Sequence, residues 1–260
     1  MATIHIRSTD SADGRTLRPL TTHPGHSIGK AMFTTLFTSA DVVASSLTGL
    51  ALMSFAAAII CFLGLSWSNE RWRIPEALVG TACLVTSLYY AGAAGYWYSS
   101  DAASAGVRFS AWYSVHPLQV VAVYFYARTQ GPVPVGVFWR LGGAALLMVF
   151  GRWLGDAGFF DESLGAILSI GFWLYILGEF YFGAIPDRIR ESSRPVKIGF
   201  FWIRLLITLG WAIYPILHFV DTVIGVGQAP AIIVLYSTFD IVNLVIPSLI
   251  VVAVAGQDRY

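Results

Sequence analysis

The segment Tyr236-Ser-Thr-Phe-Asp-Ile-Val-Asn-Leu-Val-Ile-Pro-Ser-Leu-Ile250 lies inside the last long apolar run of the chain and contains one carboxylic acid, Asp240. An ionisable side chain inside an apolar membrane segment is energetically costly and usually marks a functional site. On a helix, the side chain best placed to pair with Asp240 stands four residues later, and this residue is Leu244. The segment therefore predicts a membrane helix with a buried acid and no cation one turn after it.

The composition of the chain is that of a membrane protein. Of its 260 residues, 56% are hydrophobic and 12% are charged, whereas soluble domains carry about 25% charged residues. A bilayer core of about 30 Å needs roughly 20 apolar residues per helix. We therefore predict an all-α bundle of seven transmembrane helices in one domain, residues 36–255, with a polar tail at 1–35 and a short tail at 256–260. The seven apolar runs are 36–67, 77–99, 108–127, 137–155, 163–185, 199–221 and 229–255.

The basic residues are distributed unequally between the two sets of loops. Three loops contain neither Lys nor Arg, whereas the loops between them carry several, including Arg71 and Arg190. The positive-inside rule then predicts an N-terminus outside and a C-terminus in the cytoplasm, for a multi-pass protein of the cell inner or plasma membrane. The scattered basic residues and a net charge of +1 do not indicate a nucleic-acid partner. The loops without Lys or Arg are 100–107, 156–162 and 222–228.

Three segments resemble helices of the microbial rhodopsins, most closely those of the proteorhodopsin and xanthorhodopsin group. The spacing of Tyr236, Asp240 and Asn243 resembles the seventh helix of that family. Arg108-Phe-Ser-Ala-Trp-Tyr-Ser-Val-His-Pro117 resembles the third helix, and Gly210-Trp-Ala-Ile-Tyr-Pro215 resembles the sixth. The resemblance implies the seven-helix fold of these proteins, with a kink at Pro215.

The resemblance also places Leu244 where relatives have the lysine that binds retinal as a Schiff base. A Schiff base needs a primary amine. The chain has two lysines, Lys30 and Lys197, and neither lies in an apolar run. We therefore predict no covalently bound cofactor.

Three further positions of the third helix differ from the pattern of proton-pumping relatives. Ala111 stands at the position of the primary proton acceptor, Val115 at that of a threonine, and Ala122 at that of the proton donor. The missing groups all belong to one proton path. The resemblance therefore implies that the chain does not pump protons in light by itself.

Several aromatic residues match the walls of the family's retinal pocket, and we expect a vestigial pocket at this place. One of its residues, a histidine, replaces an aromatic residue of relatives. The expected pocket residues are Trp112, Trp173, Trp211, Tyr214, His218 and Asp240.

Arg108 and Asp240 are predicted to form a buried ion pair that stabilises the bundle, with a remaining ligand or ion role as the alternative. Removing one member of such a pair costs about 3–5 kcal/mol. His116 is expected to hydrogen-bond a neighbouring helix. We predict no metal site, because Cys61 and Cys83 lack metal-ligand spacing and His116 has no second ligand four residues away.

Two functional hypotheses remain open. The first is a structural or regulatory subunit that forms a hetero-oligomer, a trimer or pentamer, with a retinal-binding rhodopsin proton pump in the lipid bilayer. The alternative is a protein that binds retinal or a carotenoid without a covalent bond. An open cavity between Trp112, Trp173 and Trp211 would favour ligand binding, whereas filling by Leu244 and Phe239 would favour assembly alone. We do not expect an enzyme, because the spans contain no nucleophile–base pair, metal set or phosphate loop.

Overall fold

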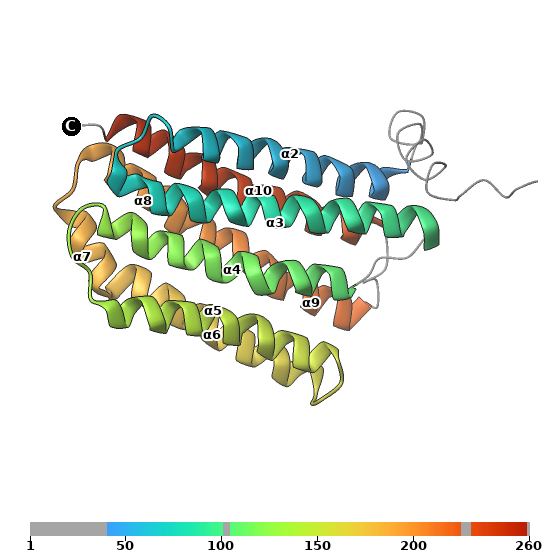
Figure 1. Ribbon diagram of the computed structural model, residues 1–260. Helices are drawn as coiled ribbons and strands as arrows, with labels where there is room; N and C mark the ends of the chain where they lie inside the picture. Colours follow the sequence, from blue (N-terminus) through green and yellow to red (C-terminus); the bar gives the residue numbers. More distant parts are fainter. Residues whose placement is uncertain (1–40, 101–104, 225–229, 259–260) are drawn as a thin grey trace, which may run out of the picture.

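The computed structural model describes residues 41–100, 105–224 and 230–258, and within these ranges it contains helices and connecting turns. The long helices run side by side in one bundle (Figure 1). The transmembrane segments are α2 (Val42–Gly64), α3 (Glu70–Ser100), α4 (Ala105–Arg128), α5 (Val135–Asp156), α6 (Glu162–Phe182) followed by the short α7 (Ala184–Arg190), α8 (Arg194–Leu205) continued by η1 (Leu206–Gly210) and α9 (Trp211–Ile224), and α10 (Pro230–Gln257).

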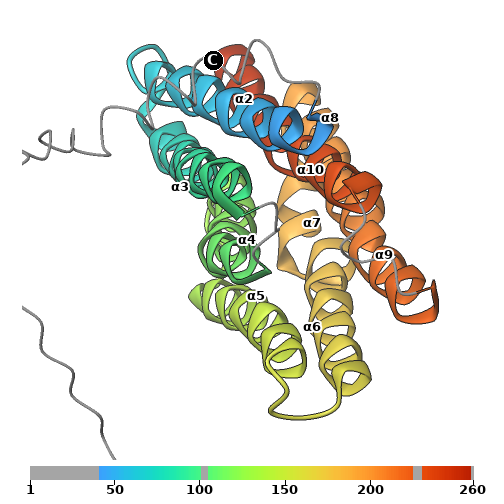
Figure 2. The ribbon, with the colours of Figure 1, turned by 90° about the vertical axis from the view of Figure 1, so that its right-hand side faces the viewer.

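Six of these segments are long and apolar enough to cross a membrane, and the 24-residue α4 lies between α3 and α5 as the seventh. Consecutive helices pack against each other, and α10 returns to pack against α2 and α3, as Figure 2 shows. The prediction of an all-α, seven-helix membrane bundle is confirmed. The termini of the described chain lie at opposite ends of the bundle; we call the end that carries Gln257 the C-terminal end.

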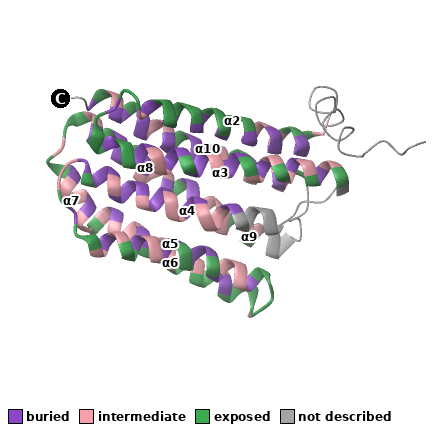
Figure 3. Cartoon of the chain, viewed as in Figure 1, coloured by how far each residue is buried: buried purple, intermediate pink, exposed green. Residues whose placement is uncertain are grey.

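Exposed positions occur along the helices (Figure 3), and many of them carry large apolar side chains. Leu52 is 62% exposed, Trp139 71% and Phe182 89%. In a soluble protein, such surfaces would be adhesive, but in a bilayer they contact lipid or another membrane protein. The chain is therefore a multi-pass membrane protein.

Two predicted boundaries are wrong. The second helix was expected from residue 77, but α3 begins at Glu70 and continues through Pro75. The proline removes one backbone hydrogen bond near the start of the helix. Glu76 is fully buried in this first part of α3, where the Ser68 hydroxyl donates to its Oε2. The predicted tail at 256–260 is also wrong in part, because α10 runs to Gln257 and the next residue is buried. The predicted tail at 1–35 lies outside the described residues.

The sixth segment contains a backbone irregularity before Pro215, which itself lies inside α9. A π-turn, η1, precedes α9, and it ends at Gly210. Asn243 of α10 donates through Nδ2 to the Gly210 carbonyl at 2.9 Å. A neighbouring helix thus satisfies a backbone acceptor of the irregular turn, which is the condition for such a turn in a membrane.

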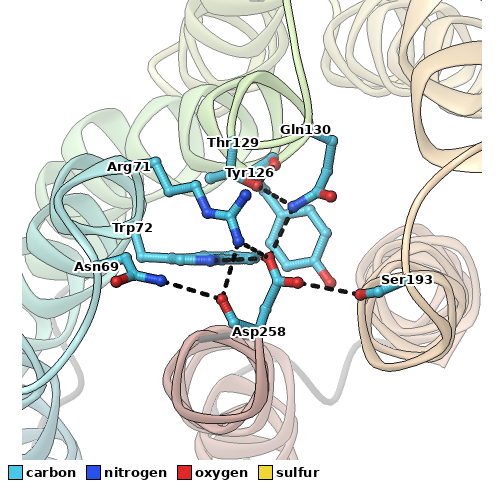
Figure 4. Close-up of polar contacts among 8 residues, drawn as sticks. All are labelled: Asn69, Arg71, Trp72, Tyr126, Thr129, Gln130, Ser193 and Asp258. Atoms are coloured by element: carbon cyan, nitrogen blue, oxygen red, sulfur yellow. Dashed lines mark hydrogen bonds and ion pairs between the residues drawn. The ribbon is translucent and has the colours of Figure 1, made fainter. Parts of the chain in front are cut away.

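Asp258, which directly follows α10, connects three other parts of the bundle (Figure 4). Its Oδ2 accepts hydrogen bonds from Trp72 Nε1 at 3.1 Å and from Gln130 Nε2 at 2.9 Å, and Arg71 Nη2 lies 3.1 Å away. Its Oδ1 accepts from Ser193 Oγ at 3.1 Å. The carboxylate is 4% exposed and joins the start of α3, the turn after α4 and the residue before α8.

Substitution of Asp258 by Ala is expected to reduce the free energy of unfolding by about 2–4 kcal/mol, because buried donors then lose their acceptor. Thermal unfolding in detergent, followed by circular dichroism, measures this loss. Asp187→Ala is the matched control, because Asp187 is 68% exposed and contacts only Arg190 among its recorded ion pairs. Equal melting temperatures of the two variants would contradict the anchoring role of Asp258.

Candidate functional site

The carboxylate of Asp240 is held by two tyrosines from two other helices. Asp240 is 6% exposed on α10. Tyr90 of α3 donates its hydroxyl to Oδ2, and Tyr214 of α9 donates to Oδ1 at 2.6 Å. The predicted partner, Arg108, lies in α4, but its side chain is outside the described residues, so the ion pair stays a prediction.

A second layer of hydrogen bonds fixes the same helices. Asn243 Nδ2 donates to the Tyr214 hydroxyl at 3.1 Å as well as to the Gly210 carbonyl. Gln119 of α4 donates through Nε2 to the Asn243 carbonyl at 2.8 Å. The polar network therefore joins α3, α4, α9 and α10 around Asp240, and it contains two residues, Tyr90 and Gln119, that the sequence motifs did not identify.

Leu244 lies one turn after Asp240 and is 3% exposed. It packs in an apolar cluster with Val115 of α4 and with Ala57 and Cys83 of α2 and α3. Lys197, the lysine within the described residues, is exposed in the first turn of α8 at the C-terminal end of the bundle. Lys30 lies outside the described residues.

The three predicted positions of the third helix are all buried in α4. Ala111 and Val115 line a small cavity of about 20 Å³ together with Asp240 and Leu244. Ala122 is 2% exposed and lines a different space of about 10 Å³. The α4 wall of the small cavity thus has no carboxylate; Ala111 and Val115 stand in it beside Trp112, His116 and Gln119.

A larger cavity of about 80 Å³ lies between α4, α5, α6, α9 and α10. Five of the six predicted pocket residues line it, and the sixth, Asp240, lines the small cavity. Its walls also include Arg152 of α5, which the sequence motifs did not identify. The predicted residues in its walls are Trp112, Trp173, Trp211, Tyr214 and His218.

His116 belongs to the walls of both cavities, as do Trp112, Trp211 and Tyr214. Its ring lies 4.6 Å from that of Trp211 and 5.4 Å from that of Trp112, measured between centroids. Its recorded polar contact is between Nδ1 and the Trp112 carbonyl of its own helix, at 3.3 Å. The expectation of a hydrogen bond to a neighbouring helix is therefore wrong; the contact with α9 is a ring contact.

The interior of the bundle is open between the tryptophans but largely filled next to Asp240. The space between Trp112, Trp173 and Trp211 is open, as ligand binding requires. Next to Asp240, Leu244 occupies the interior and leaves about 20 Å³, as assembly alone requires. Phe239 is half-buried and does not line either cavity. Among the described residues, no group of three or more His, Cys, Asp or Glu side chains is arranged to hold a metal ion.

The sequence and the fold are similar to those of known rhodopsins. The chain is 25% identical over 206 residues to the blue-light absorbing proteorhodopsin of Gamma-proteobacterium Hot 75m4, which covers 78% of this chain and 82% of the relative. It is 24% identical over 225 residues to the green-light absorbing proteorhodopsin of Gamma-proteobacterium EBAC31A08, which covers 84% and 90%.

Two crystal structures show the same bundle. The blue light-absorbing proteorhodopsin from Med12 superposes with a TM-score of 0.71 and 27% identity, over 84% of this chain and all of the other. Xanthorhodopsin superposes with a TM-score of 0.74 and 17% identity, over 84% and 93%. The sequence profile of bacteriorhodopsin-like proteins matches residues 39–257. A match over nearly the whole helical bundle, supported by these superpositions, shows that the chain belongs to the bacteriorhodopsin-like protein family.

Proposed function

We propose that this chain is a non-pigmented rhodopsin homologue that acts as a structural or regulatory subunit in a hetero-oligomer with a retinal-binding rhodopsin proton pump. The observation that carries the proposal is the burial of Leu244 one turn after Asp240. The sequence resemblance places the retinal-binding lysine of relatives at this position. Xanthorhodopsin is described as a light-driven ion pump with a dual chromophore. The present chain keeps the bundle of such proteins but differs at the residues of the photochemical path.

The residues near Asp240 do not fit a retinal bound as a Schiff base. Leu244 offers no amine, and Ala111 and Val115 offer no proton acceptor on the facing wall. Both oxygens of Asp240 already accept hydrogen bonds from tyrosines. The ring of His116 further narrows the route between the two cavities. These features support a protein that does not pump protons by itself.

The bundle itself is well packed, which supports a role for the folded scaffold. α5 and α6 approach so closely that a side chain at Gly165 would lie 2.9 Å from the Cα of Gly155. Small residues at such crossings are typical of packed membrane helices. We propose that the C-terminal end faces the cytoplasm, as the basic loops indicate, and that the exposed apolar faces contact lipid and the partner rhodopsin.

A co-expression experiment tests the proposal. The chain, with an affinity tag, is produced together with a pigmented pump from the same source, and both are purified through the tag. We expect the pump to co-purify and its light-driven transport to differ from that of the pump alone. A tagged multi-pass protein of another fold controls for non-specific association. Absence of the pump from the eluate, together with unchanged transport, would rule out this function.

The aromatic cavity favours a second candidate function, the binding of retinal or a carotenoid without a covalent bond. Its volume of about 80 Å³ lies between tryptophans that can contact the ring of an isoprenoid. Titration of the purified protein with retinal, followed by quenching of tryptophan fluorescence, tests this function. Saturable quenching supports it, and quenching equal to that of the same tryptophans in denatured protein contradicts it.

A further inference from the structure

We propose that the aromatic cavity binds a compact ring, of isoprenoid or aromatic type, that carries an uncharged carbonyl or hydroxyl oxygen, and that Arg152, which lies beside His218, donates to this oxygen. The proposal rests on the second candidate function, because it requires that the cavity takes a ligand. It adds the chemical class of the ligand and its direction. The polar end would lie at Arg152 and His218, away from Leu244.

The body of the cavity is suited to a flat apolar group. Trp112, Trp173 and Trp211 form its walls, with Tyr214 and Tyr236 beside them. Its volume of about 80 Å³ is below the roughly 150 Å³ of an apolar cavity known to admit benzene. The cavity is partly open to its surroundings, so it can enclose part of a ring while the rest of the ligand lies in the opening. A full-length polyene directed toward Leu244 would meet His116.

Arg152 and His218 give the cavity one polar side. Arg152 Nη2 lies 2.9 Å from His218 Nδ1, and Arg152 Nη1 lies 3.3 Å from His218 Nε2. The two side chains are 17% and 14% exposed, so both are largely withdrawn from the surroundings. A guanidinium has five N–H donors, and its recorded polar contacts here are all made by Nη1 and Nη2. The Arg152 guanidinium can therefore still donate a hydrogen bond to an acceptor oxygen of a ligand.

The charges around Arg152 favour an uncharged oxygen over a carboxylate. Arg152 Nη2 pairs with Asp156 Oδ1 at 2.6 Å and lies 3.3 Å from Glu162 Oε1. Glu162 Oε1 also lies 3.4 Å from His218 Nδ1. Among the described contacts, one guanidinium thus faces two carboxylates, so Arg152, Asp156 and Glu162 together carry no excess positive charge. An anionic ligand would be repelled by Asp156 and Glu162, whereas a carbonyl or hydroxyl oxygen can accept from Arg152 without that repulsion.

A matched set of ligands tests the proposal on the intact protein in lipid nanodiscs. The probes are β-ionone, which has a ketone, the hydrocarbon with the same carbon skeleton, and the acrylate of the same ring. Dissociation constants are measured by tryptophan quenching and by calorimetry. We expect β-ionone to bind about tenfold more tightly than the hydrocarbon, as one charge-assisted hydrogen bond provides, and the acrylate to bind most weakly.

Arg152→Met is expected to bring the ketone and the hydrocarbon within about twofold of each other, because it removes the donors and keeps an apolar side chain of similar length. Arg140→Met is the matched control. Arg140 lies on the same helix and pairs with Glu179 of α6 at 2.8 Å, but it does not line the cavity. The control is expected to keep the tenfold preference.

The outcomes separate this proposal from the functions on which it builds. If the hydrocarbon binds as tightly as β-ionone, or the acrylate binds best, the assigned polar recognition is wrong while ligand binding stands. If none of the three probes binds, both this proposal and the second candidate function fail. If Arg152→Met does not fold, the dissociation constants of the three probes for the unmodified protein still decide whether the proposal holds. Co-purification with a pump is unaffected by any of these results.

Discussion

Reconstitution of this chain with all-trans retinal is expected to give no visible absorption band from a protonated Schiff base. The side chain beside Asp240 is Leu244, which is buried and has no amine. Lys197 lies in the first turn of α8, outside the cavity walls. Absorption spectra of the purified protein, taken before and after addition of hydroxylamine, measure the result. A visible band that hydroxylamine bleaches would show that an imine forms and would contradict the proposed non-pigmented state.

Leu244→Lys supplies the missing amine and is expected to change this outcome from no pigment to a weak one. The new amine would stand in the wall of the small cavity with the Asp240 carboxylate, which can act as its counterion. The band remains weak because His116 narrows the space toward the aromatic cavity. His116→Ala added to Leu244→Lys is therefore expected to increase the amount of pigment.

No proton transport is expected from Leu244→Lys, because Ala111 and Ala122 still lack carboxyl groups. The matched control is Leu244→Met, which keeps the apolar volume without an amine and is expected to give no band. Light-driven acidification by Leu244→Lys at the level of an ordinary pump would show that the missing carboxyl groups at Ala111 and Ala122 do not limit proton transport.

Among the described glycines around the site, Gly210 is the one at which substitution by Ala is expected to lower stability most. A carbon atom added at Gly210 would overlap the side-chain oxygen of Asn243 and lie 2.9 Å from its Cγ. Asn243 would have to move, and its hydrogen bonds to the Gly210 carbonyl and the Tyr214 hydroxyl would be lost. Steric strain and the lost bonds together predict a decrease of about 3 kcal/mol in the free energy of unfolding.

Unfolding by denaturing detergent, followed by circular dichroism, measures this decrease. Gly143→Ala is the matched control, because Gly143 lies inside α5 and a carbon added there would meet no atom within 4 Å. The control is expected to be neutral or stabilised by up to about 1 kcal/mol, since Ala is the better helix former. If both variants have the same stability, the contact between Gly210 and Asn243 does not fix α9 against α10.

Much of the fold follows from the sequence because the length of an apolar run directly reports a membrane crossing. The motif around Pro215 likewise identified Trp211 and Tyr214, which do line the aromatic cavity. Boundaries were less predictable, since the charged start of α3 resembles a loop in composition. The helix nevertheless begins at Glu70, where its polar side chains find partners in other elements.

Contacts between distant segments could not be predicted from the chain alone. Tyr90 lies in an aromatic run, 89–98, that is typical of a membrane interface, yet its hydroxyl bonds Asp240, 150 residues later. Arg152 lies in a glycine-rich helix segment, and nothing in the pattern of this segment predicts its contact with His218, 66 residues away. Asp258 has the composition of a polar tail but contacts a residue of α3 and the residue before α8. Each of these roles depends on the packing of whole helices.

The position of His116 has an evolutionary consequence. The imidazole of His116 is in ring contact with Trp112 and Trp211, and all three residues line both cavities. Under the proposed function, an amine at Leu244 alone would give little pigment, and loss of the imidazole alone would supply no attachment point. Efficient light capture would therefore depend on two substitutions together, so the proposed silent state is protected against single mutations.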